Sequence, residues 1–74
     1  MRDARKIPII YTMINEAHKA VSSDLRVGQF LANFFGWIAT EKGREIYYIK
    51  DEELVNMLEE YVKEVTGNDE LFSD

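Results

Sequence analysis

The chain has 74 residues, a formal net charge of −5 and no cysteine. This length allows one small domain, and folding at this size buries only about 60% of the accessible surface. The lack of cysteine excludes disulfides, cysteine-bound iron–sulfur clusters and a thiol nucleophile. No run approaches the roughly 20 apolar residues of a membrane span, and the first 20 residues lack the apolar core of a signal peptide. We therefore expect a cytoplasmic protein that does not enter a membrane.

The first predicted helix covers about residues 8–21. Pro8 suits its first turn, where the missing N–H has no partner to lose. Apolar residues at intervals of three and four define one buried stripe, with Tyr11 and His18 on its edge. The stripe consists of Ile7, Ile10, Ile14, Ala17 and Val21.

The second predicted helix covers about residues 23–40, with an N-cap among residues 22–24 and with Gly43 after its end. It is apolar around most of its circumference, which predicts a helix sandwiched between the other two. Its bulky side consists of Val27, Leu31, Phe34, Phe35 and Ile38. Its small-residue side consists of Gly28, Ala32, Gly36 and Ala39. This side predicts close approach of another backbone, and the alternative is that the glycines are merely tolerated.

The polar side chains of this second helix fall on one stripe, at the spacing of a helical turn. With the neighbouring indole, the stripe consists of Arg26, Gln29, Asn33, Trp37 and Thr40. Guanidinium and amide groups can recognise a carboxylate, a peptide backbone or a base edge, and tryptophan is enriched at interface hot spots. The stripe is therefore our candidate interaction surface. The alternative is that it is only the solvent-facing side of the helix.

Residues 46–49, Ile-Tyr-Tyr-Ile, have strand-like side chains but no second strand to pair with, so we expect a short extended connector. The third predicted helix covers residues 51–66, with Asp51 as its N-cap and Gly67 after its end. The result is an all-α, compact three-helix domain of residues 1–67. Residues 68–74 are expected to form a flexible acidic tail.

The charge is divided unevenly along the chain. Residues 1–50 carry eight Lys or Arg and five acidic residues, for a net charge of +3. Residues 51–74 carry one Lys and nine acidic residues, for a net charge of −8. This balance disfavours nonspecific nucleic-acid binding, which needs clustered positive charge. The acidic third helix and tail are either solvated, paired with the basic half of the chain, or presented to a basic partner.

Catalytic and cofactor signatures are missing from the sequence. His18 is the only histidine, and no serine, lysine or acid stands at a spacing that predicts a catalytic triad with it. One histidine without cysteine predicts no metal centre, and the four glycines match no phosphate-binding loop. We therefore expect His18 to be structural, and we expect no cofactor, no metal and no enzymatic activity.

Three blocks of the sequence resemble a group of short proteins from bacteria and their phages. The blocks are Arg2-Asp3 followed by Ile7, residues 24–33 with the pattern Asp-Leu-Arg-x-Gly-Gln-x-x-x-Asn, and residues 46–54. The resemblance extends to about Tyr61, and the chain departs from the group at His18 and Ser23, where tryptophan and proline are frequent. It implies a small helical fold and a bacterial or phage setting, and it implies no activity or site.

These features predict a noncatalytic protein-interaction or regulatory module. Its partner is an unknown protein or a second copy of the chain in a homodimer. The nine aromatic residues exceed what three helices readily enclose. Some of a set of four should therefore be exposed or covered by a partner: Trp37, Tyr47, Tyr48 and Phe72. The alternative is a helix-turn-helix-like nucleic-acid-binding regulator that uses the second helix.

Overall fold

The computed structural model describes residues 4–67 of the chain. These residues form three α-helices, α1 (Ile7–Val21), α2 (Val27–Glu41) and α3 (Asp51–Thr66). Two single turns of 3-10 helix, η1 (Ala4–Lys6) and η2 (Ile46–Tyr48), precede α1 and α3. The predicted compact three-helix fold is confirmed, with no β-strand among the described residues.

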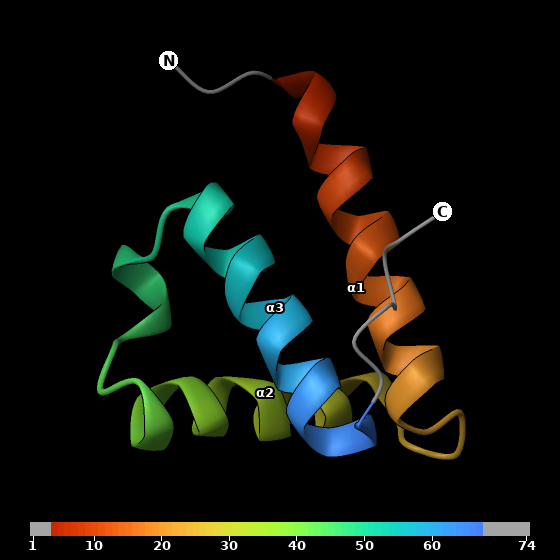
Figure 1. Cartoon of the computed structure of the whole chain (residues 1–74). Helices are drawn as coiled ribbons and strands as arrows, with labels where there is room; N and C mark the ends of the chain where they lie inside the picture. Colours follow the sequence, from red (N-terminus) through yellow and green to blue (C-terminus); the bar gives the residue numbers. More distant parts are fainter. Residues whose placement is uncertain (1–3, 68–74) are drawn as a thin grey trace.

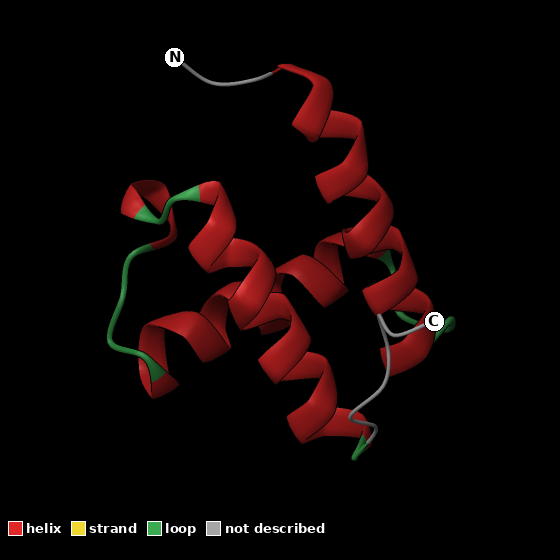
Figure 2. Ribbon diagram, turned by 45° about the horizontal axis from the view of Figure 1, so that its top comes forward, coloured by secondary structure: helices red, strands yellow, loops and turns green. Residues whose placement is uncertain are grey.

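The helix that joins the domain together is α3, which packs against both of the others. Figure 1 shows α1 and α3 running side by side in the same direction, while α2 crosses the C-terminal half of α3. The turned view in Figure 2 shows the same crossing. Direct packing between α1 and α2 is slight, although only a short loop joins them. The prediction that the second helix is sandwiched is therefore wrong, because α3 takes the central place.

The core brings together side chains from all three helices. The seven buried residues in the described part of the chain are Ala17, Phe30, Phe34, Ile38, Leu58, Tyr61 and Val62. The Phe34 ring lies 5.3 Å from the Tyr61 ring and 6.4 Å from the Phe30 ring, measured between centroids. Burial raises the pKa of the Tyr61 hydroxyl, because its charged form loses water. The centre of the core is thus an aromatic cluster between α2 and the second half of α3, and α1 adds Ala17 to it.

The buried face of α2 is rotated from the predicted one. Phe30, which lies outside the predicted bulky side, is completely buried, whereas Val27 is 62% exposed. The buried positions 30, 34 and 38 are four residues apart and share one face. Phe30 is held there by its ring contacts with His18, at 5.0 Å, and with Tyr61, at 6.3 Å. Several faces of this helix are apolar, so hydropathy alone could not choose between them.

The small-residue side of α2 faces solvent. Its four residues, Gly28, Ala32, Gly36 and Ala39, are all exposed. A Cβ added at Gly28 or Gly36 would meet nothing within 4 Å outside its own helix. The predicted close approach of another backbone is therefore wrong within this chain. Glycine and alanine bury little apolar area, so leaving them in water costs little.

The helix boundaries follow local hydrogen bonds. Ser22 ends α1, and its Oγ accepts the N–H of Asp24 at 3.2 Å, which forms a turn where the sequence predicted the cap of the next helix. α2 instead begins at Val27, with Arg26 as an extended N-cap residue. The Gln29 side chain accepts the Arg26 N–H at 2.9 Å. The side-chain oxygen of Ser22 is occupied by the turn, so the helix starts four residues later than predicted.

Two further local predictions are corrected near α3. The predicted extended connector at residues 46–49 is extended only at its flanks, because Ile46–Tyr48 form the η2 turn. The Ile49 N–H donates to the Ile46 carbonyl at 3.2 Å and closes this turn. Asp51 is the first residue of α3 and Lys50 is its N-cap. The Asp51 charge still favours the helix start, where the dipole is positive. Gly67 ends α3, as predicted, and has the left-handed φ of 74°. Gly43, predicted as the left-handed residue after the second helix, has a φ of 61°. The predicted tail, residues 68–74, lies outside the described part.

Candidate functional site

The predicted polar stripe on α2 divides into two parts with different roles. At the start of the helix, Arg26 and Gln29 are exposed and form the cap bond between the Arg26 N–H and the Gln29 Oε1. Asn33 is exposed one turn later. The Thr40 hydroxyl donates to the carbonyl of Gly36 at 2.9 Å within the same helix. Gln29 and Thr40 therefore use their side chains for bonds within α2.

Trp37 belongs to the packing between α2 and α3. Its ring centroid lies 5.3 Å from that of Tyr61 and 6.3 Å from that of Phe34. Its Nε1–H donates to Glu64 Oε2 at 3.2 Å, and the Lys42 ammonium lies 5.4 Å from the ring centre. An indole that donates to α3 and stacks on the core is a structural anchor between these helices. None of the five stripe residues lines the largest apolar hollow described below, between α1 and α2.

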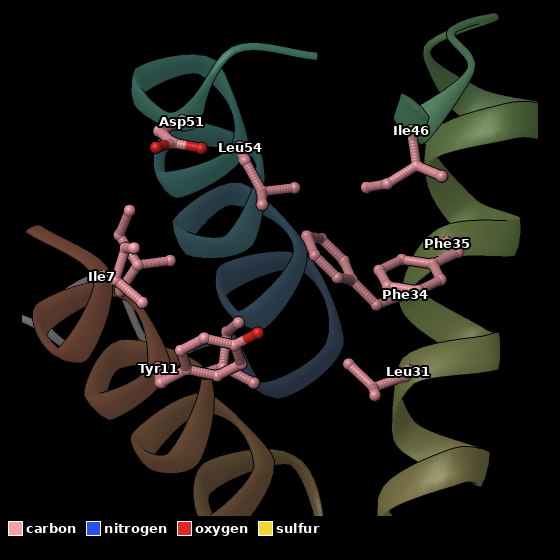
Figure 3. Close-up of a pocket in the computed structure, with 10 residues that line it drawn as sticks. Ile7, Tyr11, Leu31, Phe34, Phe35, Ile46, Asp51 and Leu54 are labelled. Atoms are coloured by element: carbon pink, nitrogen blue, oxygen red, sulfur yellow. The ribbon is translucent and has the colours of Figure 1, made fainter. Parts of the chain in front are cut away.

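The candidate site that the structure adds is an apolar groove of about 280 Å³ between α1 and α2, above the first half of α3. In Figure 3 the labelled side chains of α1 and α2 lie on opposite sides of this space, and Leu54 of α3 lies between them. We call this surface the α1–α2 groove. It is lined by Ile7, Ile10, Tyr11, Ile14, Leu31, Phe34, Phe35, Ile46, Asp51 and Leu54.

The rims of the α1–α2 groove expose large apolar side chains. Ile7 is 38% exposed and Tyr11 is 68% exposed on the α1 rim, while Phe35 is 37% exposed on the α2 rim. The buried Phe34 lies deeper. Among the lining side chains, polar atoms come only from the Tyr11 hydroxyl and the Asp51 carboxylate. Such a surface can bind an apolar ligand and has few groups with which to orient a polar one.

The sequence predicted several of the groove residues as core, and the fold leaves most of these partly uncovered. Ile7, Ile10 and Ile14 form the predicted apolar stripe of the first helix, but all three are only partly buried or exposed. The reason is that α2 crosses the far half of α3 and does not cover the first turns of α1. The excess of aromatic residues was the available signal. In agreement with it, Tyr47 is 81% exposed and Tyr48 is 72% exposed, while Phe72 lies outside the described residues.

Apolar surface continues around the first turns of α1. On the side of α1 toward Val55, a second hollow of about 260 Å³ is lined by Ile9, Ile10 and Met13, with Lys6, Asp51 and Glu52 at its edge. Ile9 is 59% exposed. The N-terminal half of α1 therefore shows apolar side chains on two sides, with charged groups grouped at its beginning.

The acidic α3 is paired with basic residues from the first fifty. Lys6 Nζ lies 4.0 Å from Glu52 Oε1, Lys42 pairs with Glu60, and Arg44 Nη1 donates to Glu53 Oε2 at 3.0 Å. Of the three roles considered for the acidic region, pairing with the basic half is therefore present in the described part. These pairs are exposed, so each contributes little to stability.

The Arg44–Glu53 pair predicts a specific titration behaviour. The hydrogen bond from Arg44 holds the pKa of Glu53 below its ordinary value. Because the folded pKa is lower than the unfolded one, this pair stabilises the fold above the ordinary glutamate pKa, and the effect is lost as the pH falls through the lowered value. We expect Arg44→Met to raise the titration midpoint of the Glu53 carboxyl carbon in NMR. Lys19→Met is the control, and an unchanged midpoint in Arg44→Met would contradict this assignment.

His18 has a structural contact. Its Nε2 lies 2.6 Å from the carbonyl oxygen of Leu25, which can only accept, so the ring donates a hydrogen bond that holds the loop between α1 and α2. Its ring also stacks on Phe30. Within residues 4–67, no three His, Cys, Asp or Glu residues are grouped to hold a metal ion.

Among the described helices, none is both long enough and apolar enough to cross a bilayer. Comparisons of the chain with protein-family models, with curated proteins and with solved structures find no match. The resemblance to short bacterial and phage proteins therefore stays a prediction.

Proposed function

We propose that the chain is a noncatalytic protein-interaction module that binds an amphipathic α-helix in the α1–α2 groove. The observation that supports this most strongly is the exposure of Ile7, Tyr11 and Phe35 around one hollow. Singly exposed apolar residues are ordinary, but several that line one groove mark a site for a partner. The groove lies between two helices, and such grooves receive the apolar face of a third helix with residues spaced by three and four.

The lining also defines the chemistry of this partner. Aliphatic and aromatic side chains surround the space, and Asp51 places one carboxylate at its edge. A helix with apolar residues at positions i, i+3, i+4 and i+7 fits the lining, and a Lys or Arg at one end would lie near this carboxylate. Binding would remove the groove residues from water, so its free energy would come mainly from apolar burial.

A library of displayed amphipathic helices, selected for binding at nanomolar concentration of the chain, tests this function. We expect the enriched helices to lose binding to Phe35→Glu by about 100-fold or more, because a charge in the groove would have to be buried. Val27→Glu is the matched control, since Val27 lies on the same helix, is 62% exposed and does not line the groove. Both variants should keep the helical circular dichroism of the parent chain.

Two results would overturn this function. One is an enrichment of helices that bind Phe35→Glu and the parent chain equally well, and the other is a selection that yields no helix binders. The nucleic-acid alternative predicts a mobility shift of duplex DNA whose affinity falls steeply with salt. We expect no such shift, because the only basic residue on the exposed start of α2 is Arg26 and none lies within the helix.

A further inference from the structure

We propose that the helix that occupies the α1–α2 groove is α1 of a second copy of this chain, so that the protein forms a two-fold homodimer. This inference rests on the proposed function of the groove and names its partner. In the dimer, the exposed α1 rim of each copy lies in the groove of the other.

The same surface contains a groove and the projecting edge of α1, so the α1 edge of one copy can bind in the groove of the other. Tyr11 and Ile7 line the groove, yet they also project from α1 at exposed fractions of 68% and 38%. On α1 the apolar positions 7, 10, 11 and 14 have the spacing that a helix needs to lie in an apolar groove. A two-fold interface uses the same patch on both copies. A patch that contains both a groove and a projecting apolar helix edge meets that requirement.

The charged groups beside the groove carry both signs. Lys6 and Glu52 lie at the edge of the adjoining second hollow, 4.0 Å apart, and their side chains are 59% and 74% exposed. Asp51 lines both this hollow and the α1–α2 groove. An ion pair this exposed contributes little, so its members can exchange partners between copies at little cost. A rim that carries both signs matches a second rim of the same composition, whereas a strongly basic or strongly acidic partner would meet a like charge.

Because the core is small, covering the groove with a second copy would stabilise the fold. Only seven side chains are buried in the described residues, and only Ala17 among them comes from α1. Domains of this size gain little stability from one core, and many depend on association. A partner that binds only the folded state stabilises it by mass action. A second copy is always present at the concentration of the chain, so it can supply this stabilisation permanently.

Sedimentation velocity of the full chain tests the dimer. Concentrations from about 1 to about 500 μM span a dissociation constant in the micromolar range. We expect a monomer–dimer equilibrium, with a melting temperature that rises with concentration. Tyr11→Glu should weaken the dimer by about 100-fold or more, because it places a charge in the apolar interface. Tyr47→Glu is the matched control, because it makes the same change at a more exposed tyrosine that does not line the groove.

An isotope-filtered NOE experiment on mixed labelled and unlabelled chains gives the contact directly and needs no variant. We expect NOEs between Tyr11 ring protons of one copy and Phe35 ring protons of the other. A parent chain that stays monomeric over the whole range, or a dimer that Tyr11→Glu leaves intact, would overturn the second-copy assignment. The displayed-helix selection decides separately whether the groove binds helices, so a monomer that still yields groove-directed binders removes only the homodimer.

Discussion

Replacing Phe34 with alanine should destabilise the domain by about 3–5 kcal/mol, the usual cost of removing a buried phenylalanine ring. Phe34 is 1% exposed, and its ring contacts those of Phe30, Trp37 and Tyr61. The alanine would leave a cavity where α2 meets α3. Because a domain of this size is stabilised by only about 3–5 kcal/mol, we expect the variant to lose most of its helical circular dichroism at 25 °C, the usual reference temperature.

Val27→Ala is the matched control for this effect. It removes apolar atoms from the same helix at a position that is 62% exposed, so its free energy of unfolding should stay within about 0.5 kcal/mol of the parent value. Urea unfolding at one fixed protein concentration measures both, because association would otherwise add to the apparent stability. A Phe34→Ala variant that loses less than about 1 kcal/mol would place the core elsewhere.

A substitution at Gly36, in the middle of α2, is expected to stabilise the domain. Alanine there should raise the free energy of unfolding by about 1 kcal/mol, because helical glycine carries an entropic cost that alanine avoids. The added methyl group meets nothing within 4 Å outside its helix. For a domain of this length, such a gain raises the melting temperature by roughly 4–8 °C. Thermal unfolding followed by circular dichroism measures it.

Gly67 provides the matched control for that substitution. It carries the same glycine-to-alanine change at φ 74°, a left-handed conformation that costs an alanine roughly 1–2 kcal/mol. We therefore expect Gly67→Ala to lower the melting temperature. If Gly36→Ala also lowers the melting temperature, the prediction is contradicted. The small-residue side of α2 would then be in close contact with another molecule.

Much of the secondary structure was predictable because it depends on local spacing. Positions 7, 10, 14, 17 and 21 define α1, and the end of α3 follows from the conformation that Gly67 allows. Helix boundaries were harder to predict where one side chain can form either of two hydrogen bonds. Ser22 could cap a helix or form a turn, and the structure shows the turn. The difference depends on Gln29, seven residues away, which caps the N-terminal end of α2.

The candidate site was predictable only in part. Four residues of the polar stripe lie on α2 and Arg26 is its N-cap, but the Trp37 side chain donates to Glu64 and packs against Tyr61 on α3. The groove could not be located from periodicity. Phe35 and Ile7 have the same hydropathy whether a neighbouring helix covers them or leaves them on a rim. Only the excess of aromatic residues indicated that some apolar surface would stay uncovered.

The sequence by itself determined three helices, their approximate lengths, the division of charge and a surplus of apolar side chains. These properties depend on residues within a few positions of one another. The tertiary structure decided that α3 is central, that Phe30 and not Val27 is buried, and that α1 and α2 enclose a groove. Those outcomes depend on how α2 crosses α3. The crossing is set by the shape of an aromatic cluster from distant parts of the chain, which hydropathy does not record.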